Sequence, residues 1–142
     1  MQEAIRVLLV EDNPGDVELT RELLEATGLQ VRLRVASDGQ QALALLLRAP
    51  APGAAAATDL VLLDLNLPRL SGRELLAEMR RHEALRALPV VVLTSSDAEQ
   101  DLQAGQELGA CRVMTKPLGV QAMRDAVHLL RTVLPAALGR PP

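Results

Sequence analysis

Short apolar segments alternate along this chain with longer segments whose apolar residues recur at helical spacing. The segment AIRVLLV at 4–10 is almost continuously apolar, which is typical of a strand buried on both faces. The segment QVRLRVA at 30–36 alternates instead, which predicts a strand with one solvent-facing side. In total, strands are predicted over 4–10, 30–36, 59–64, 89–94 and 111–115.

Capping residues between these strands mark the starts of helices. Asn13 and Pro14 suit the start of a helix that runs to about residue 26 and ends near Gly28. Capping boxes, in which Glu follows Ser three residues later, are predicted at Ser71–Glu74 and Ser96–Glu99. Further helices are predicted over 38–49 and 119–134, and the low-complexity segment at 49–58 is predicted to be a loop.

Strands and helices that alternate in this way predict a parallel sheet with helices on both faces. We expect a doubly wound, flavodoxin-like α/β fold with five strands in the order 2-1-3-4-5. The length of 142 residues fits one domain, expected over 1–135 and followed by a short tail at 136–142. No effector domain is expected after the last helix.

Chemically capable side chains follow four of the predicted strands: Glu11 and Asp12, Asp64, Thr94 and Lys116. In a sheet of this order the first and third strands are neighbours, and ligands bind beyond their carboxyl ends. The carboxylates are therefore expected to converge at one site.

Three carboxylates in one cleft repel one another, so a counter-charge is expected. Together with one lysine they leave a charge of about −2, which a single divalent cation would cancel. Hard oxygen ligands with room for water favour magnesium. Beside such an ion, and flanked by Thr94 and Lys116, the Asp64 carboxylate is arranged to accept a phosphoryl group.

Each of these residues also has a purely structural interpretation. The acids after the first strand could serve helix capping, Asp64 could cap the turn before Pro68, and Thr94 could simply end its strand. Lys116 could be a solvated loop residue. Their joint placement at strand ends favours the functional interpretation.

Composition narrows the classes of function. A net charge of −3 and a pI near 5.4 provide no basic patch for nucleic acid or an anionic membrane, and the chain has no aromatic side chain for base stacking. The single cysteine, Cys111, cannot form an internal disulfide, and no apolar run reaches the ~20 residues of a membrane span. We expect a cytoplasmic protein with no nucleic-acid or membrane partner.

With these residues in view, the chain resembles the receiver domain of two-component response regulators. The motifs VLLVEDN, LVLLDLNLPRLSG, PVVVLTSS and MTKPL carry the resemblance over nearly the whole chain. LLDLNLP and VVVLTSSDAEQD look most like the small single-domain regulators paired with bacterial phytochrome histidine kinases. The resemblance implies phosphoryl transfer from such a kinase, followed by hydrolysis of the aspartyl phosphate in the receiver itself.

The resemblance also implies roles for individual residues. Asp64 would be the phosphoacceptor, and Mg²⁺ would be bound by Asp12 directly, by Glu11 mainly through water, and by Asp64. Asn66 would contribute its backbone carbonyl.

Three further roles belong to the end of the chain. Thr94 would be the switch hydroxyl, and Lys116 would pair with the phosphoryl group and precede a cis bond to Pro117. One residue departs from the family pattern, because Val113 occupies the position of the usual aromatic switch residue. Coupling through a moving ring is therefore not expected.

Two rival functions remain. A flavodoxin-like redox carrier could share the fold, but its flavin phosphate needs an amide-donating loop where VEDNPGD presents carboxylates. A pure interaction module would not need Asp64, Thr94 and Lys116 together.

The last predicted helix has a broad apolar side. Residues expected to face the sheet are Val120, Met123, Val127, Leu130 and Leu134, and Ala122, Ala126, Leu129 and Val133 extend the apolar arc to roughly 180°. A helix on one sheet needs only about 100°. We therefore expect a homodimer through 119–134, as well as a sensor histidine kinase as partner.

Overall fold

The fold is described from a computed structural model. It describes residues 5–47, 58–65, 67, 70–83, 85–94, 112–115 and 119–125. The predicted capping box at Ser96–Glu99 and the loop at 49–57 lie outside these residues.

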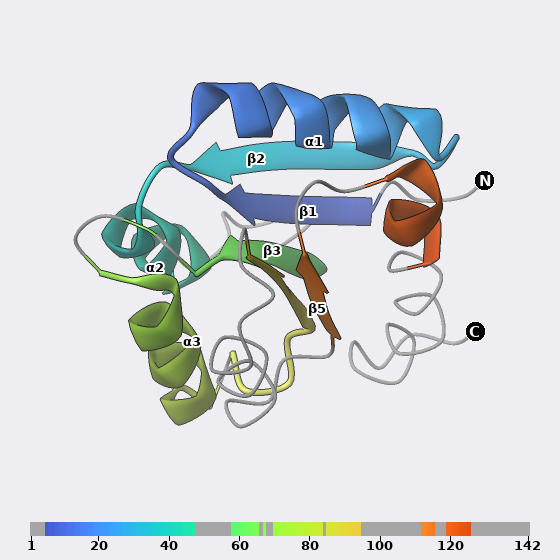
Figure 1. Ribbon diagram of the computed structural model, residues 1–142. Coiled ribbons are helices and arrows are strands. Elements are labelled where there is room, and N and C mark those ends of the chain that lie inside the picture. The colour runs from blue at the N-terminus through green and yellow to red at the C-terminus, as the bar shows by residue number, and fades with distance from the viewer. Residues whose placement is uncertain are drawn as a thin grey trace, which may run out of the picture.

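The centre of the fold is a parallel sheet (Figure 1). Its strands are β1 (Ile5–Val10), β2 (Val31–Ala36), β3 (Leu60–Asp64), β4 (Val90–Thr94) and β5 (Arg112–Thr115). The predicted order 2-1-3-4 is confirmed, since β1 pairs with β2 and β3, and β3 pairs with β4. β5 runs beside β4, with Thr115 in register with Thr94.

Helices lie on both faces of the sheet, as predicted. They are α1 (Pro14–Ala26), α2 (Gly39–Leu47), α3 (Gly72–Arg81) and a helical segment at 120–125. Figure 1 shows α1 along one face and α2 with α3 on the other. Within the described residues, none of the helices is both long and apolar enough to cross a membrane.

The predicted caps set the starts of α1 and α3. The Asn13 side chain accepts hydrogen bonds from the backbone N–H groups of Gly15 (2.8 Å) and Asp16 (3.2 Å). Ser71 and Glu74 form a complete capping box. These caps matter for the site because α1 begins directly after β1, and α3 begins shortly after β3.

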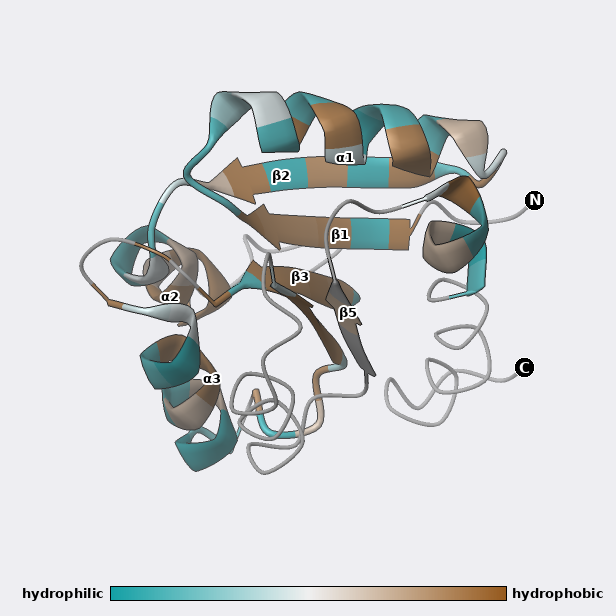
Figure 2. Cartoon of the chain, viewed as in Figure 1, coloured by the Kyte–Doolittle hydropathy of each residue, from teal (hydrophilic) through white to brown (hydrophobic). Residues whose placement is uncertain are grey.

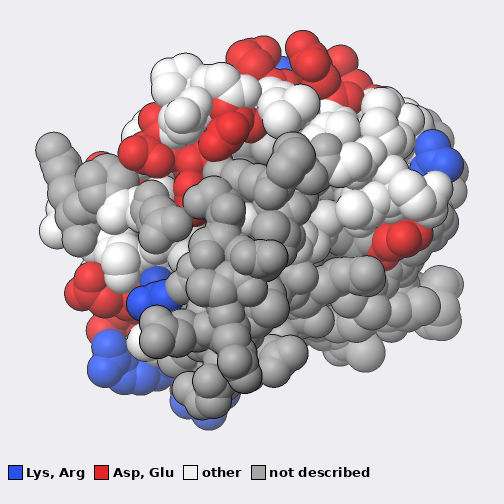
Figure 3. Space-filling view, in the orientation of Figure 1, with Lys and Arg blue, Asp and Glu red and all other residues white. Residues whose placement is uncertain are grey.

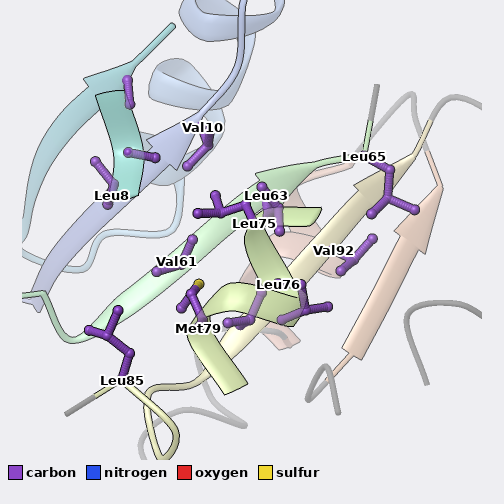
Figure 4. Close-up of a cluster of buried hydrophobic side chains, with 13 residues drawn as sticks. Leu8, Val10, Val61, Leu63, Leu65, Leu75, Leu76, Met79, Leu85 and Val92 are labelled. Carbon is purple, nitrogen blue, oxygen red and sulfur yellow. The ribbon is translucent and has the colours of Figure 1, made fainter. Parts of the chain in front are cut away.

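Two apolar clusters sandwich the sheet. One joins β1, β3 and β4 to Leu23 and Leu24 of α1 and to Met123, and the other joins the opposite face to α2 and α3. In Figure 4, Leu75, Leu76 and Met79 of α3 lie over β3. Figure 2 shows β1 and β3 as mainly hydrophobic, whereas β2 alternates, as expected for a strand at the edge.

One prediction about the last helix is wrong. Met123 is fully buried as expected, but Val120 is exposed (36%), although it was expected to face the sheet. Val120 and Met123 are three residues apart and therefore point about 60° away from each other around the helix axis. In the described turn, the arc that faces the sheet is too narrow to include both.

A buried ion pair joins the starts of β1 and β3. Asp59, which is 3% exposed, accepts hydrogen bonds from the backbone N–H of Arg6 (2.9 Å) and from its guanidinium group (3.2 Å). The backbone N–H of Asp59 donates in return to the Arg6 carbonyl at 2.7 Å. This pairing fixes the register of β3 against β1 at the end of the sheet opposite Asp64.

Replacement of Asp59 by alanine should lower the free energy of unfolding by about 2 kcal/mol, because three buried or partly buried donors of Arg6 lose their acceptor. Asp59→Asn keeps an acceptor for the Arg6 amide and should lose less. Urea unfolding followed by far-UV circular dichroism measures both. A loss of less than about 0.5 kcal/mol for Asp59→Ala, the size of a surface effect, would contradict this role.

Candidate functional site

The register of the two central strands brings acidic residues together. Val10 of β1 lies beside Leu63 of β3, so the residues that follow, Glu11 and Asp64, emerge side by side at the carboxyl end of the sheet. The Glu11 N–H donates to the carbonyl of Ala36 at 3.0 Å, which extends the pairing with β2 beyond β1. Both acids are therefore placed by hydrogen-bonded backbone.

Three carboxylates form a cluster at this edge. Glu11, Asp12 and Asp64 can each direct one oxygen so that all three oxygens lie within 4.8 Å of one another. Glu11 is 1% exposed and Asp64 6%, whereas Asp12 is exposed to solvent. The cluster therefore has two buried walls and an open side.

The electrostatics of this cluster favour a cation. Two ionised carboxylates at this separation repel each other by an energy of the order of 3 kcal/mol at an effective dielectric constant of about 20. Acidic side chains also gather over the neighbouring α1, as Figure 3 shows. A divalent cation would offset the repulsion.

The donor set fits magnesium. Carboxylate oxygens are hard ligands, and a site with one exposed acid leaves room for the waters that Mg²⁺ retains. Within the described residues no histidine or cysteine joins the cluster, so nothing in it favours a softer metal such as zinc. The predicted convergence of Glu11, Asp12 and Asp64 is thus present in the structure.

Thr94 lies on the strand next to Asp64. It is the last residue of β4 and is fully buried, and its neighbour Leu93 is in register with Asp64. The Leu93 carbonyl also accepts a hydrogen bond from the N–H of Leu65 at 3.3 Å, which continues the pairing of β3 past the acid. Thr94 is therefore at the same edge of the sheet as the acids.

The other predicted site residues are not covered. Asn66, Lys116 and Pro117 lie outside the described residues, as does Cys111. Val113 is in β5. Their predicted roles at the site remain predictions.

Sequence reasoning missed one residue at the site, Gly72. It is the first residue of α3, and its N–H donates to the Leu65 carbonyl at 3.2 Å, directly after Asp64. A signal was present in the sequence, because glycine is a poor helix former and still follows the capping residue Ser71.

Comparison with known proteins identifies relatives of the chain. Residues 7–128 match the profile of the family described as response regulator receiver domain. Among curated proteins, the response regulator Rcp1 of Synechocystis sp. is 40% identical over 137 residues, covering 92% of this chain and 93% of Rcp1.

Solved structures agree with this match. The bacteriophytochrome response regulator AtBRR is 39% identical with a TM-score of 0.79, covering 92% of this chain and 94% of AtBRR. A Mn²⁺-bound form of Rcp1 is 35% identical, with a TM-score of 0.71 and coverages of 92% and 89%. The phosphorylated cyanobacterial phytochrome response regulator RcpA is 33% identical, with a TM-score of 0.73 and coverages of 94% and 91%.

Loss of one carboxylate should weaken metal binding. We expect the wild type to bind Mg²⁺ weakly and Asp12→Ala to bind it roughly tenfold or more weakly still, because Asp12 is one of only three charged ligands. Calorimetric titration with Mg²⁺ measures the change. Glu22→Ala, which removes an exposed acid from α1, is the matched control and should bind as the wild type does. Equal affinities in both variants would place the metal elsewhere.

Proposed function

This chain belongs to the response regulator receiver domain family, and from that premise we propose that it is a signalling switch phosphorylated on Asp64. The observation that carries the proposal is the cluster at the end of β3. There a buried aspartate lies within 4.8 Å of two further carboxylates at the edge where parallel sheets bind ligands.

The proposed reaction transfers a phosphoryl group from a phosphohistidine of a sensor kinase. A carboxylate oxygen of Asp64 attacks phosphorus, a P–O bond forms, and the P–N bond breaks. The departing imidazole keeps the bonding electron pair and takes a proton from solvent. In the later hydrolysis, water attacks phosphorus, and inorganic phosphate and the free carboxylate are released.

The surrounding residues have separate proposed roles. Mg²⁺, held by Asp12 directly, by Glu11 through water and by Asp64, would supply positive charge that stabilises the phosphoryl oxygens. The buried Thr94 hydroxyl would donate a hydrogen bond to the bound phosphoryl group. Lys116 would pair with its charge, and the backbone carbonyl of Asn66 would complete the ligand set.

The extent and partners of the domain follow from the same proposal. The receiver would occupy 1–135 with five strands in the order 2-1-3-4-5, and its place in the cell would be the cytoplasm. Its similarity to AtBRR and RcpA supports a phytochrome histidine kinase as the phosphodonor. Output would pass through protein contacts or phosphorelay rather than DNA, since the net charge is −3.

A flavodoxin-like redox carrier is a weaker alternative. The loop after the first strand would need to donate amides to a flavin phosphate, but Glu11 and Asp12 stand there and would repel it. The cluster instead favours binding of a cation.

Substitution of the proposed acceptor should abolish phosphorylation. With Mg²⁺ and acetyl phosphate, we expect the wild type to gain one acid-stable, base-labile phosphoryl group by mass, and Asp64→Asn to gain none. Asp59→Asn is the matched control, because Asp59 is a buried aspartate next to the other end of β3 and should leave incorporation intact. Phosphate that persists in Asp64→Asn would contradict the assignment.

Dimerisation through 119–134 is a further expectation of this proposal. The wild type should sediment as a dimer at tens of micromolar, and Leu129→Glu with Val133→Glu should make it a monomer, because two charges enter an apolar contact. Analytical ultracentrifugation decides, with Arg131→Glu on the predicted polar side as control. A monomeric wild type, or a double variant that remains a folded dimer, would refute the interface.

A further inference from the structure

Two glycines contact the chain on either side of the β3–α3 connection. A Cβ atom at Gly72 would lie 2.3 Å from the carbonyl oxygen of Asp64 and 2.6 Å from the Cα of Leu65. A Cβ atom at Gly39, the first residue of α2, would lie 2.2 Å from the carbonyl oxygen of Leu70. Each distance is below the 3.0 Å that real Cβ atoms keep.

We propose that Gly39 and Gly72 form a glycine clamp that positions Asp64 for metal binding and phosphoryl transfer. The two glycines act through the backbone and are positioning residues. The inference rests on the proposed function of Asp64 and adds residues to its site that lie outside the acid cluster.

Gly72 acts on Asp64 directly. The start of α3 is fixed by the Ser71–Glu74 capping box, and the Gly72 N–H donates to the Leu65 carbonyl at 3.2 Å. With no side chain on Gly72, the end of β3 packs against the first turn of α3 at the peptide that carries Asp64. An added methyl group meets backbone atoms, which cannot rotate away as a side-chain tip can.

Gly39 acts on the other end of the connection. The start of α2 is itself held, because the Asp38 carboxylate accepts from the Gln41 N–H at 2.8 Å and the Gln41 side chain accepts from the Ser37 N–H at 2.7 Å. From this fixed turn, Gly39 lies against the Leu70 backbone, two residues before Gly72. α2 therefore limits how far the start of α3 can move away from β3.

The chemistry depends on such a constraint. A shift of about 1 Å in a reacting group can reduce a rate by about 100-fold, and changes in the groups that orient metal ligands reduce metal affinity roughly 10- to 100-fold. Both glycines are the first residue of a helix, where alanine would be favoured by helix propensity alone. Their close contacts supply the reason for glycine.

The test compares Gly72→Ala and Gly39→Ala with Gly119→Ala. Gly119 also immediately precedes or starts helical structure, but a Cβ there meets nothing within 4 Å, so this variant is the matched control. Mn²⁺ affinity is measured from the electron paramagnetic resonance signal of the free ion. The phosphorylation rate is measured with acetyl phosphate at saturating Mg²⁺, and stability by urea unfolding.

We expect both clamp variants to fold, to bind Mn²⁺ roughly tenfold or more weakly, and to be phosphorylated more slowly even at saturating metal. Gly119→Ala should match the wild type in all three measurements. A purely structural role would lower the urea midpoint but leave the Mn²⁺ affinity and the rate of the folded protein unchanged, and that result would overturn the proposal.

Two other results are decisive. If neither clamp variant folds, the glycines serve the whole fold rather than Asp64, and the proposal is overturned. If the wild type takes up no phosphate, the proposed function fails, but the Mn²⁺ affinities still decide the clamp. Wild-type affinity in folded Gly72→Ala and Gly39→Ala would then reject it.

Discussion

The crowding of three carboxylates at one edge of a parallel sheet is the constraint on which the rest of this structure depends. Glu11 and Asp64 are almost completely buried and lie next to each other because β1 and β3 are neighbours in register. The backbone that holds them is paired beyond both acids, through Glu11 with Ala36 and Leu65 with Leu93. Mutual repulsion therefore cannot easily separate them, and a bound cation is the economical way to stabilise the arrangement.

Much of this arrangement could be predicted from the sequence, because it follows from local signals. The acids end apolar segments, and Asn13 and Ser71 mark the starts of the helices that follow. Once the alternation of strands and helices fixes a parallel sheet, the strand order alone brings Glu11 to Asp64.

What could not be predicted depends on contacts between distant segments. The Arg6–Asp59 pair joins residues 53 positions apart, and the contact of Gly39 with Leu70 joins two separate connections. Neither leaves a periodic pattern. Val120 shows the limit of periodicity itself, since spacing says which residues share a side of a helix but not how wide a strip the sheet covers.

The most direct test of the central claim is to locate the phosphoryl group chemically. Borohydride reduces an aspartyl phosphate to homoserine, so the wild type treated with Mg²⁺, acetyl phosphate and then borohydride can be digested and sequenced by mass spectrometry. We predict homoserine at position 64 and aspartate unchanged at position 12. Homoserine at position 12, or a phosphoryl group retained on Thr94 with position 64 unmodified, would contradict the account.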